Sequence, residues 1–156
     1  MPAHGAELIW KAGSQEDFLA GRYLRRHEIR FDGGASIAGS SSPSVVREPL
    51  SDPSAADPEE MFVAAIASCH MLWFLDYARR AGVFVRVYRD EPFGEMGKNP
   101  QGKTAVLAVT LRPHVECDAD AATLEELHHK AHEACFIANS VTSDVRVEPV
   151  FEIAKV

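Results

Sequence analysis

The sequence of 156 residues is long enough for one domain with a sizeable core. Its 46% hydrophobic and 25% charged residues are typical of globular proteins and argue against a disordered tail. A formal net charge of −7 argues against a general nucleic-acid binder or a protein that binds anionic membranes. We therefore expect one domain over residues 1–156 that binds neither nucleic acid nor membrane.

The start of the chain and its cysteines bear on the compartment. The opening MPAHGAELIW has no basic segment followed by an apolar run, so we expect no signal peptide. Cys69, Cys117 and Cys135 are an odd number of cysteines at long spacings, which disfavours a disulfide scaffold. The expected compartment is therefore a reducing cytoplasm.

The N-terminal part of the chain contains strand patterns followed by a loop. An edge strand is expected over residues 7–10, and RYLRRHEIRF alternates between two faces over residues 22–31. The turn DGG at 32–34 leads to a returning strand over 35–38. Residues 39–57 are rich in Ser, Pro and Asp and predict a long loop, which in a compact domain usually has a function or covers something.

The most strongly marked element is a long helix from Asp57 to Gly82. Asp57 suits the N-cap, and Glu60 three residues later completes a capping box. Gly82 suits the left-handed position that ends a helix. Residues 61–75 are apolar except for one serine and one histidine, so the helix is apolar nearly all round. Because the uninterrupted apolar part is too short to span a membrane, we expect the helix to be buried in the core.

The second half of the chain alternates strands with one further helix. A strand is expected over 83–89, a loop rich in Gly and Pro over 91–102, and a strand over 103–115. A second helix is expected from near Thr123, with Glu126 in its capping box.

A final strand is expected over 144–153, with a bulge at Pro149. The order of elements predicts an α+β fold in which antiparallel sheets cover two central helices.

Two of the cysteines are the leading candidates for chemistry. Cys69 and Cys135 each lie on the apolar face of one predicted helix, so their sulfurs could approach each other if those helices pack together. From the residues alone, inert core cysteines are the more common outcome. The functional alternative is a peroxidatic thiol whose sulfenic acid is captured by a resolving thiol. That chemistry needs a cation to lower the pKa of the first thiol, and the arginines of residues 22–30 could supply it.

The histidines offer a rival site. His128 and His132 are four residues apart on one helix face, a spacing that zinc can use. No HExxH pattern accompanies them, so we favour a solvated polar face over a metal site. His70 directly follows Cys69, but neighbours on a helix point about 100° apart, which makes His70 a poor proton acceptor for that thiol.

The cysteine segments resemble a known family. PEEMFVAAIASCHM around Cys69 resembles the cysteine helix of the OsmC/Ohr thiol peroxidases, and ACFIANSV around Cys135 resembles the second-cysteine segment of that family. YLRRHEIRFDGG and the SSSP loop resemble the OsmC-like branch rather than Ohr proper. The resemblance extends from about Tyr23 to Val147, and two cysteine motifs at a family-like separation form a specific signal.

The resemblance implies an intertwined homodimer that reduces organic hydroperoxides to alcohols. Cys69 would be the peroxidatic cysteine and Cys135 the resolving one, with a dithiol or a lipoylated protein as reductant and no cofactor or metal. Glu59 matches a family glutamate that works with an arginine. The Ohr branch of the family carries that arginine in a glycine-flanked turn, where this chain has Asp32-Gly33-Gly34 and no arginine. We expect Arg25 or Arg30 to replace it, and we prefer Arg25 because it shares a strand face with apolar residues.

Helix geometry limits the role of Glu59. Ten residues separate it from Cys69, about 15 Å along a helix axis, so it cannot touch Cys69 of its own helix. A partner subunit supplies it, an arginine bridges the gap, or Glu59 only stabilises the helix N-terminus. The alternative to an enzyme is a stress-related protein of the same fold, or a module that binds a small hydrophobic ligand without catalysis.

Overall fold

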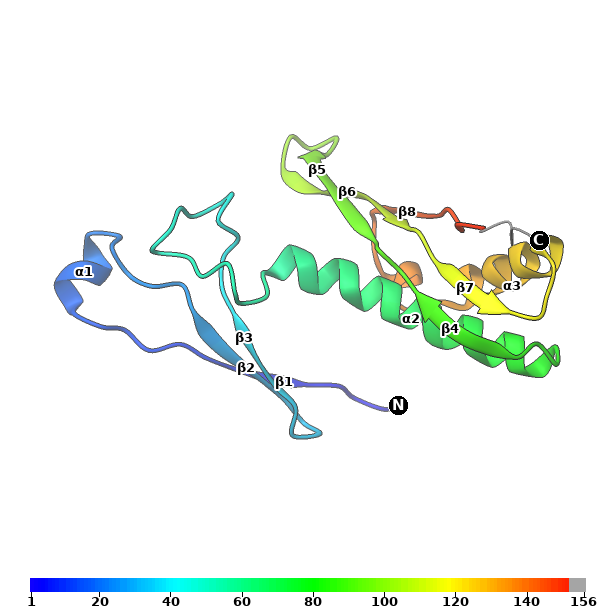
Figure 1. Cartoon of the computed structure of the whole chain (residues 1–156). Coiled ribbons are helices and arrows are strands. Elements are labelled where there is room, and N and C mark those ends of the chain that lie inside the picture. Colours follow the sequence, from blue (N-terminus) through cyan, green and yellow to red (C-terminus); the bar gives the residue numbers. More distant parts are fainter. Residues whose placement is uncertain (152–156) are drawn as a thin grey trace. The chain divides into compact units, whose positions relative to one another are not determined.

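The computed structural model describes residues 1–151, and its backbone contacts divide the chain at residues 61 and 62 into two compact units (Figure 1). Both units contain helices and mostly antiparallel strands, so the predicted α+β class is confirmed. Each unit is described by itself below.

The first unit is built on a three-stranded antiparallel sheet in the order β1-β2-β3. Its elements are β1 (Ala6–Ile9), a short helix α1 (Gln15–Leu19) that the sequence did not predict, β2 (His27–Phe31) and β3 (Ser36–Gly39). The predicted strand over 22–31 is wrong in its first half. The Trp10 indole donates to the Leu24 carbonyl, and the Arg25 amide donates to the Leu50 carbonyl, so this segment pairs with loops instead of a strand.

The turn and the loop of this unit follow the sequence. Gly34 has a φ of 94°, which favours glycine, and its amide donates to the Phe31 carbonyl at 3.0 Å. The predicted loop over 39–57 contains no helix, and only the end of β3 at Gly39 falls within it.

The long helix α2 (Pro58–Arg80) begins and ends where its sequence signals place it. The Asp57 amide donates to the Glu60 carboxylate at 3.0 Å, and the Glu60 amide donates to the Asp57 carboxylate at 2.8 Å. Gly82 has a φ of 74°. The predicted capping box and the left-handed glycine are both confirmed.

The burial of α2 differs from the prediction. Only one stripe at four-residue spacing is fully buried, and Leu72 on another side is 61% exposed. The stripe comprises Ile66, His70, Phe74 and Ala78. By length and composition the whole of α2 is also long and apolar enough to cross a membrane. A core helix of a soluble protein meets the same criteria, and the buried stripe shows that α2 packs as the core helix of the second unit.

The second unit contains two small sheets and two further helical segments. The strands β4 (Val85–Arg89) and β7 (His114–Cys117) form an antiparallel pair. In the other sheet β6 (Thr104–Leu111) lies between β5 (Phe93–Lys98), which is antiparallel to it, and β8 (Asp144–Val147), which is parallel to it. The helical segments are α3 (Ala121–Ala134) and the 3₁₀ turn η1 (Ala138–Ser140).

Two glycines explain why β5 was missed. The sequence predicted a loop over 91–102, but Gly94 and Gly97 lie within β5. A Cβ on Gly94 would come within 2.9 Å of the Val63 side chain, and one on Gly97 within 2.5 Å of the Leu107 side chain. The glycines therefore allow close packing onto the strand instead of making turns.

Three other boundaries are corrected. The predicted strand over 103–115 is two strands, β6 and β7, with Pro113 between them. The helix α3 begins at Ala121, and Asp120 is its N-cap, accepting from the Thr123 amide at 2.9 Å. Glu126 pairs with Lys130 and does not take part in a capping box with Thr123. The final strand ends at Val147, and the end of its predicted range, residues 152–153, lies outside the described residues.

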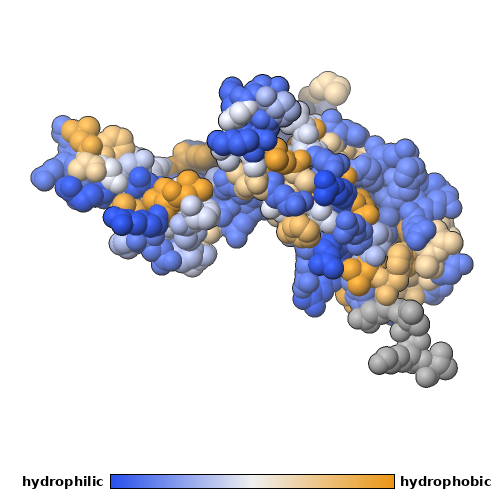
Figure 2. Space-filling model, turned by 90° about the horizontal axis from the view of Figure 1, so that it is seen from above, coloured by the Kyte–Doolittle hydropathy of each residue, from blue (hydrophilic) through white to orange (hydrophobic). Residues whose placement is uncertain are grey.

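The helices α2 and α3 share the main apolar cluster of the second unit. Phe74 and Ala78 of α2 pack with three residues of α3, namely Leu124, Leu127 and Ala131. A second cluster joins Ile66 of α2 to Val109 and Leu111 of β6. Both units also expose large apolar side chains, and the face in Figure 2 shows apolar patches among polar residues.

Candidate active site

Two thiols from different elements meet beside α2. Cys69 is half-buried on α2, and Cys135 is fully buried at the residue that ends α3. The Cys135 thiol lies 3.9 Å from the Ile66 carbonyl oxygen, to which it donates, and Ile66 is one turn before Cys69. The packing of α3 on α2 thus holds Cys135 against the turn that carries Cys69.

The Cys135 thiol is held in its neutral form. Burial raises the pKa of Cys135 to about 11, and the adjacent Cys69 thiol adds to the rise through a hydrogen bond and its charge. The amides of Ala138 and Ile137 oppose this by donating toward the sulfur. Cys135 is therefore a protonated thiol at neutral pH, and both cysteines are reduced. The arrangement can form a disulfide once one sulfur is oxidised.

Aromatic residues lie close in sequence to both cysteines. Trp73 follows Cys69 by one helical turn, and Phe136 directly follows Cys135. Their rings meet edge to face, with centroids 5.4 Å apart and planes at 90°. Tyr77 also stacks with Trp73, with a centroid distance of 5.8 Å. The sequence analysis did not single out these residues, although their spacing from the two cysteines was the available signal.

Glu59 lies in the first turn of α2 and is half-buried. Its Oε2 is buried and has no hydrogen-bond partner among the described residues. A carboxylate oxygen in that state is costly unless another group pairs with it.

The candidate arginines lie in the first unit. The Arg25 guanidinium is 3.7 Å from the Tyr23 ring centroid and donates to the carbonyls of Gly21 and Tyr23. No carboxylate pairs with it in the part of the chain that the structure describes. Arg30 donates two bonds of 2.9 Å to Glu28.

The preference for Arg25 needs a new reason. Arg25 precedes β2, so the argument that it shares a strand face with Ile29 is wrong. Its lack of a carboxylate partner now distinguishes it from Arg30.

A buried pair of histidines connects the same two helices. His70 Nε2 of α2 lies 3.1 Å from His128 Nδ1 of α3, and the rings are nearly parallel at 6°. Phe74 stacks on the other side of His128, with centroids 4.2 Å apart. The predicted polar face is therefore wrong for His128, which packs into the core, and right for exposed His129.

Burial keeps this pair uncharged. Burial, together with the charges of His128 and His132, lowers the pKa of His70 to about 3. It also lowers the pKa of His128 to about 4. At neutral pH both rings are neutral, so one nitrogen donates and the other accepts.

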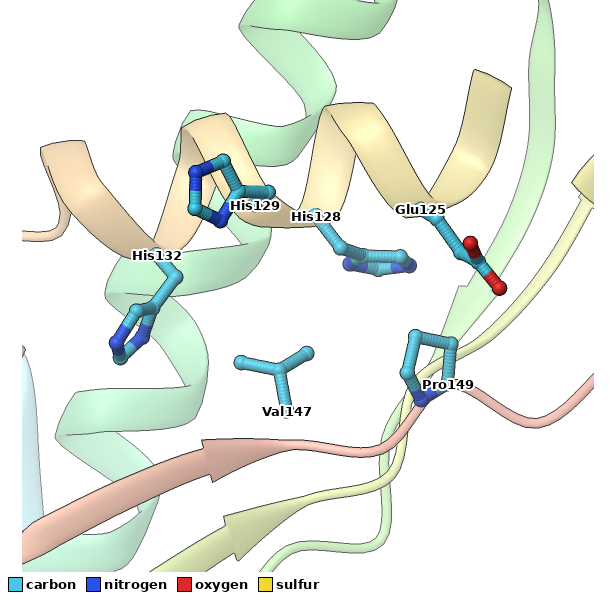
Figure 3. Close-up of a pocket in the computed structure, with 6 residues that line it drawn as sticks. All are labelled: Glu125, His128, His129, His132, Val147 and Pro149. Carbon is cyan, nitrogen blue, oxygen red and sulfur yellow. The ribbon is translucent and has the colours of Figure 1, made fainter. Parts of the chain in front are cut away.

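A pocket of about 380 Å³ opens between α3 and the chain after β8. Its lining comprises Glu125, His128, His129, His132, Val147 and Pro149. In Figure 3 His128 and His132 extend from α3 toward the strand that carries Val147. Among residues 1–151 no three His, Cys, Asp or Glu side chains are grouped closely enough to hold a metal ion, so the zinc alternative gains no support.

The fold and the paired thiols define a mixed α+β chain in which a half-exposed cysteine has a buried cysteine beside it. The profile of the family described as OsmC-like protein matches residues 51–150, which is more than half of the sequence. The chain therefore belongs to the OsmC-like family.

Solved structures agree with this assignment. An OsmC-like protein of unknown function from Vibrio cholerae is 46% identical with a TM-score of 0.92, over 96% of this chain and 100% of that one. The organic hydroperoxide resistance protein OsmC from Legionella pneumophila is 18% identical with a TM-score of 0.70, over 97% and 98% of the two chains. OhrB of Bacillus subtilis, an organic hydroperoxide resistance protein, is 20% identical with a TM-score of 0.66, over 94% and 98%. No curated protein matches the sequence.

Proposed function

We propose that this protein is a cysteine-based peroxidase that reduces organic hydroperoxides to alcohols. The observation that carries the proposal is the position of the Cys135 thiol, protonated and buried, against the turn of α2 that carries half-exposed Cys69. An inert core cysteine needs no second thiol beside it, whereas a resolving cysteine must lie there.

The chemistry divides between the two thiols. The Cys69 thiolate attacks the terminal oxygen of ROOH, the O–O bond breaks, and the alkoxide takes a proton to leave as ROH. Cys69 becomes a sulfenic acid. The Cys135 thiol then attacks the sulfenic sulfur, and water leaves as the Cys69–Cys135 disulfide forms. A dithiol, such as a lipoylated protein, reduces this disulfide and becomes a disulfide itself.

Two further residues belong to the proposed site. Arg25, which has no carboxylate partner among the described residues, would stabilise the Cys69 thiolate and hold the peroxide oxygen. Glu59 would orient Arg25 through the carboxylate oxygen that is buried without a partner. Because Glu59 is about 15 Å from Cys69 along α2, we propose that it serves Cys69 of a second subunit in a homodimer.

The relatives support the reaction class. Several solved structures of the same fold are named organic hydroperoxide resistance proteins. The more similar Vibrio cholerae protein has an unknown function, so the proposal rests on the thiol geometry and not on a name. A reducing cytoplasm is the compartment that suits free thiols.

A thiol count tests the proposal. Protein that is first reduced with a dithiol and then freed of it is mixed with cumene hydroperoxide, and the remaining thiols are titrated. We expect two thiols to disappear per chain, and mass spectrometry to find a Cys69–Cys135 disulfide with Cys117 still free. Untouched thiols would contradict the enzyme, and an apolar ligand retained on such protein would support the binding module instead.

A further inference from the structure

Trp73 and Phe136 form an aromatic pair, called the aromatic wall below, that is partly exposed to solvent. Phe136 is 67% exposed, although its ring contacts Trp73, which is itself half-buried against the main apolar cluster. Trp73 shares the side of α2 that carries Cys69, and Phe136 is the neighbour of Cys135 in sequence. Both halves of the wall are thus attached to the residues that do the proposed chemistry.

The composition of the wall indicates what it recognises. Tyr77 continues the wall along α2, with its plane at 29° to the Trp73 ring. Aromatic rings make stacked and edge-to-face contacts with a flat apolar group, but they make no comparable contact with a small polar peroxide such as H₂O₂. Exposed apolar surface beside a reactive group is a common sign of a ligand site.

We infer that Trp73 and Phe136 are specificity-determining residues that favour hydroperoxides carrying an aromatic ring near the peroxide group. This inference rests on the proposed peroxidase function and adds the class of substrate. The substrate ring stacks on the exposed side of the Trp73–Phe136 pair while its terminal peroxide oxygen faces Cys69. An aromatic contact of this kind is worth roughly a two- to tenfold preference over an aliphatic group.

Two substrates and a matched control test the inference. Cumene hydroperoxide and tert-butyl hydroperoxide both carry the peroxide on a tertiary carbon, and a phenyl group in the first replaces a methyl group in the second. Phe136→Leu keeps an apolar side chain and removes the ring. Phe84→Leu is the control, because Phe84 is 66% exposed in the same unit and makes no ring contact with Trp73.

We expect Phe136→Leu to lower kcat/KM for cumene hydroperoxide two- to tenfold more than for tert-butyl hydroperoxide, mainly through KM. Trp73→Leu changes the ratio in the same direction, and Phe84→Leu leaves it unchanged. If both substrates fall equally in Phe136→Leu, the inference is overturned. The inference is also overturned if sedimentation shows that wild-type protein is a dimer, that Phe136→Leu is a monomer, and that this variant loses activity toward both substrates. The aromatic wall would then be an interface between two copies of the chain. If wild-type protein oxidises its thiols with neither substrate, the proposed function itself fails.

Discussion

Neighbouring residues of α2 make two unlike polar contacts with α3. Cys69 lies at the border of the buried stripe and has the Cys135 thiol beside it, whereas His70 lies within the stripe and pairs with His128. Cys69 is half-exposed, and His70 and His128 are almost fully buried. One helix step therefore separates a partly exposed thiol, Cys69, from a buried histidine, His70.

This difference separates chemistry from structure. A reacting group must meet its substrate, and the border of a buried stripe gives a thiol access and an apolar surround together. The histidine pair is neutral and hydrogen-bonded across the two helices, so it contributes to how α2 and α3 pack, although His70 Nδ1 is buried without a partner among the described residues. If this division is correct, changes at the thiols abolish reaction without unfolding, and changes at the histidines alter stability without stopping reaction.

The largest effect is expected at the thiols. Cys69→Ser should reduce peroxide consumption to the uncatalysed rate, because the nucleophile is lost. Cys135→Ser should still react once, leaving a Cys69 sulfenic acid that dimedone labels and mass spectrometry detects. Cys117→Ser is the control and should turn over normally. Equal peroxide consumption in Cys69→Ser and wild type would remove Cys69 from the mechanism.

Acid should act on the histidine pair. The pKa values of His70 and His128 in the folded protein, about 3 and about 4, lie below the ordinary value of 6.5. Between these values the unfolded chain binds protons that the folded protein does not bind. The stabilisation is complete above pH 6.5 and is lost as the pH falls toward 4. At about 1.4 kcal/mol per pKa unit, we expect a loss on the order of 6 kcal/mol from the two groups together between pH 6.5 and pH 4, measured by urea unfolding at several pH values. A flat stability profile over this range would mean that the rings are not buried as neutral groups.

A smaller loss is expected when one ring is removed. His128→Leu leaves His70 Nε2 buried without its partner, which should cost about 1–3 kcal/mol of unfolding free energy. His129→Leu is the control, because His129 is exposed on the same helix and makes only a surface contact with Glu133. The thiols of folded His128→Leu should still react with cumene hydroperoxide. Loss of that reaction in a folded variant would give the pair a catalytic role.

The sequence predicted those parts of the fold that depend on neighbouring residues. The caps of α2 and the turn at Gly34 follow from local hydrogen bonds and backbone angles, which the residue types report directly. The strand β5 was missed because Gly94 and Gly97 serve packing against Val63 and Leu107, which are distant in sequence. Glycine alone does not tell a turn from a close contact.

The candidate site divides in the same way. The cysteines could be named from the sequence and from the resemblance, and the structure brings them together. The prediction that Cys135 lies on a helix face is wrong, because α3 ends at Ala134 and Cys135 is its extended C-cap residue. His128 was assigned to a polar face because no metal-binding pattern accompanies it, but its burial depends on His70 and Phe74 of another helix. The four-residue spacing of His70 between Ile66 and Phe74 was a usable signal, since it places a histidine on the stripe that the helix buries.

The smallest effect is expected when both rings are replaced at once. In His70→Leu/His128→Leu no polar atom of the pair remains unpaired, and leucines fill an apolar site next to Phe74. Replacing both partners of a buried hydrogen bond by apolar groups is often nearly neutral, so the double variant should be within about 1 kcal/mol of wild type at pH 7. The unfolding free energy of the double variant should also depend much less on pH, because both histidines with lowered pKa values have been removed. Urea unfolding at pH 7 and pH 5 measures both effects. A double variant less stable than His128→Leu would show that the imidazoles themselves, and not only their mutual hydrogen bond, hold α2 against α3.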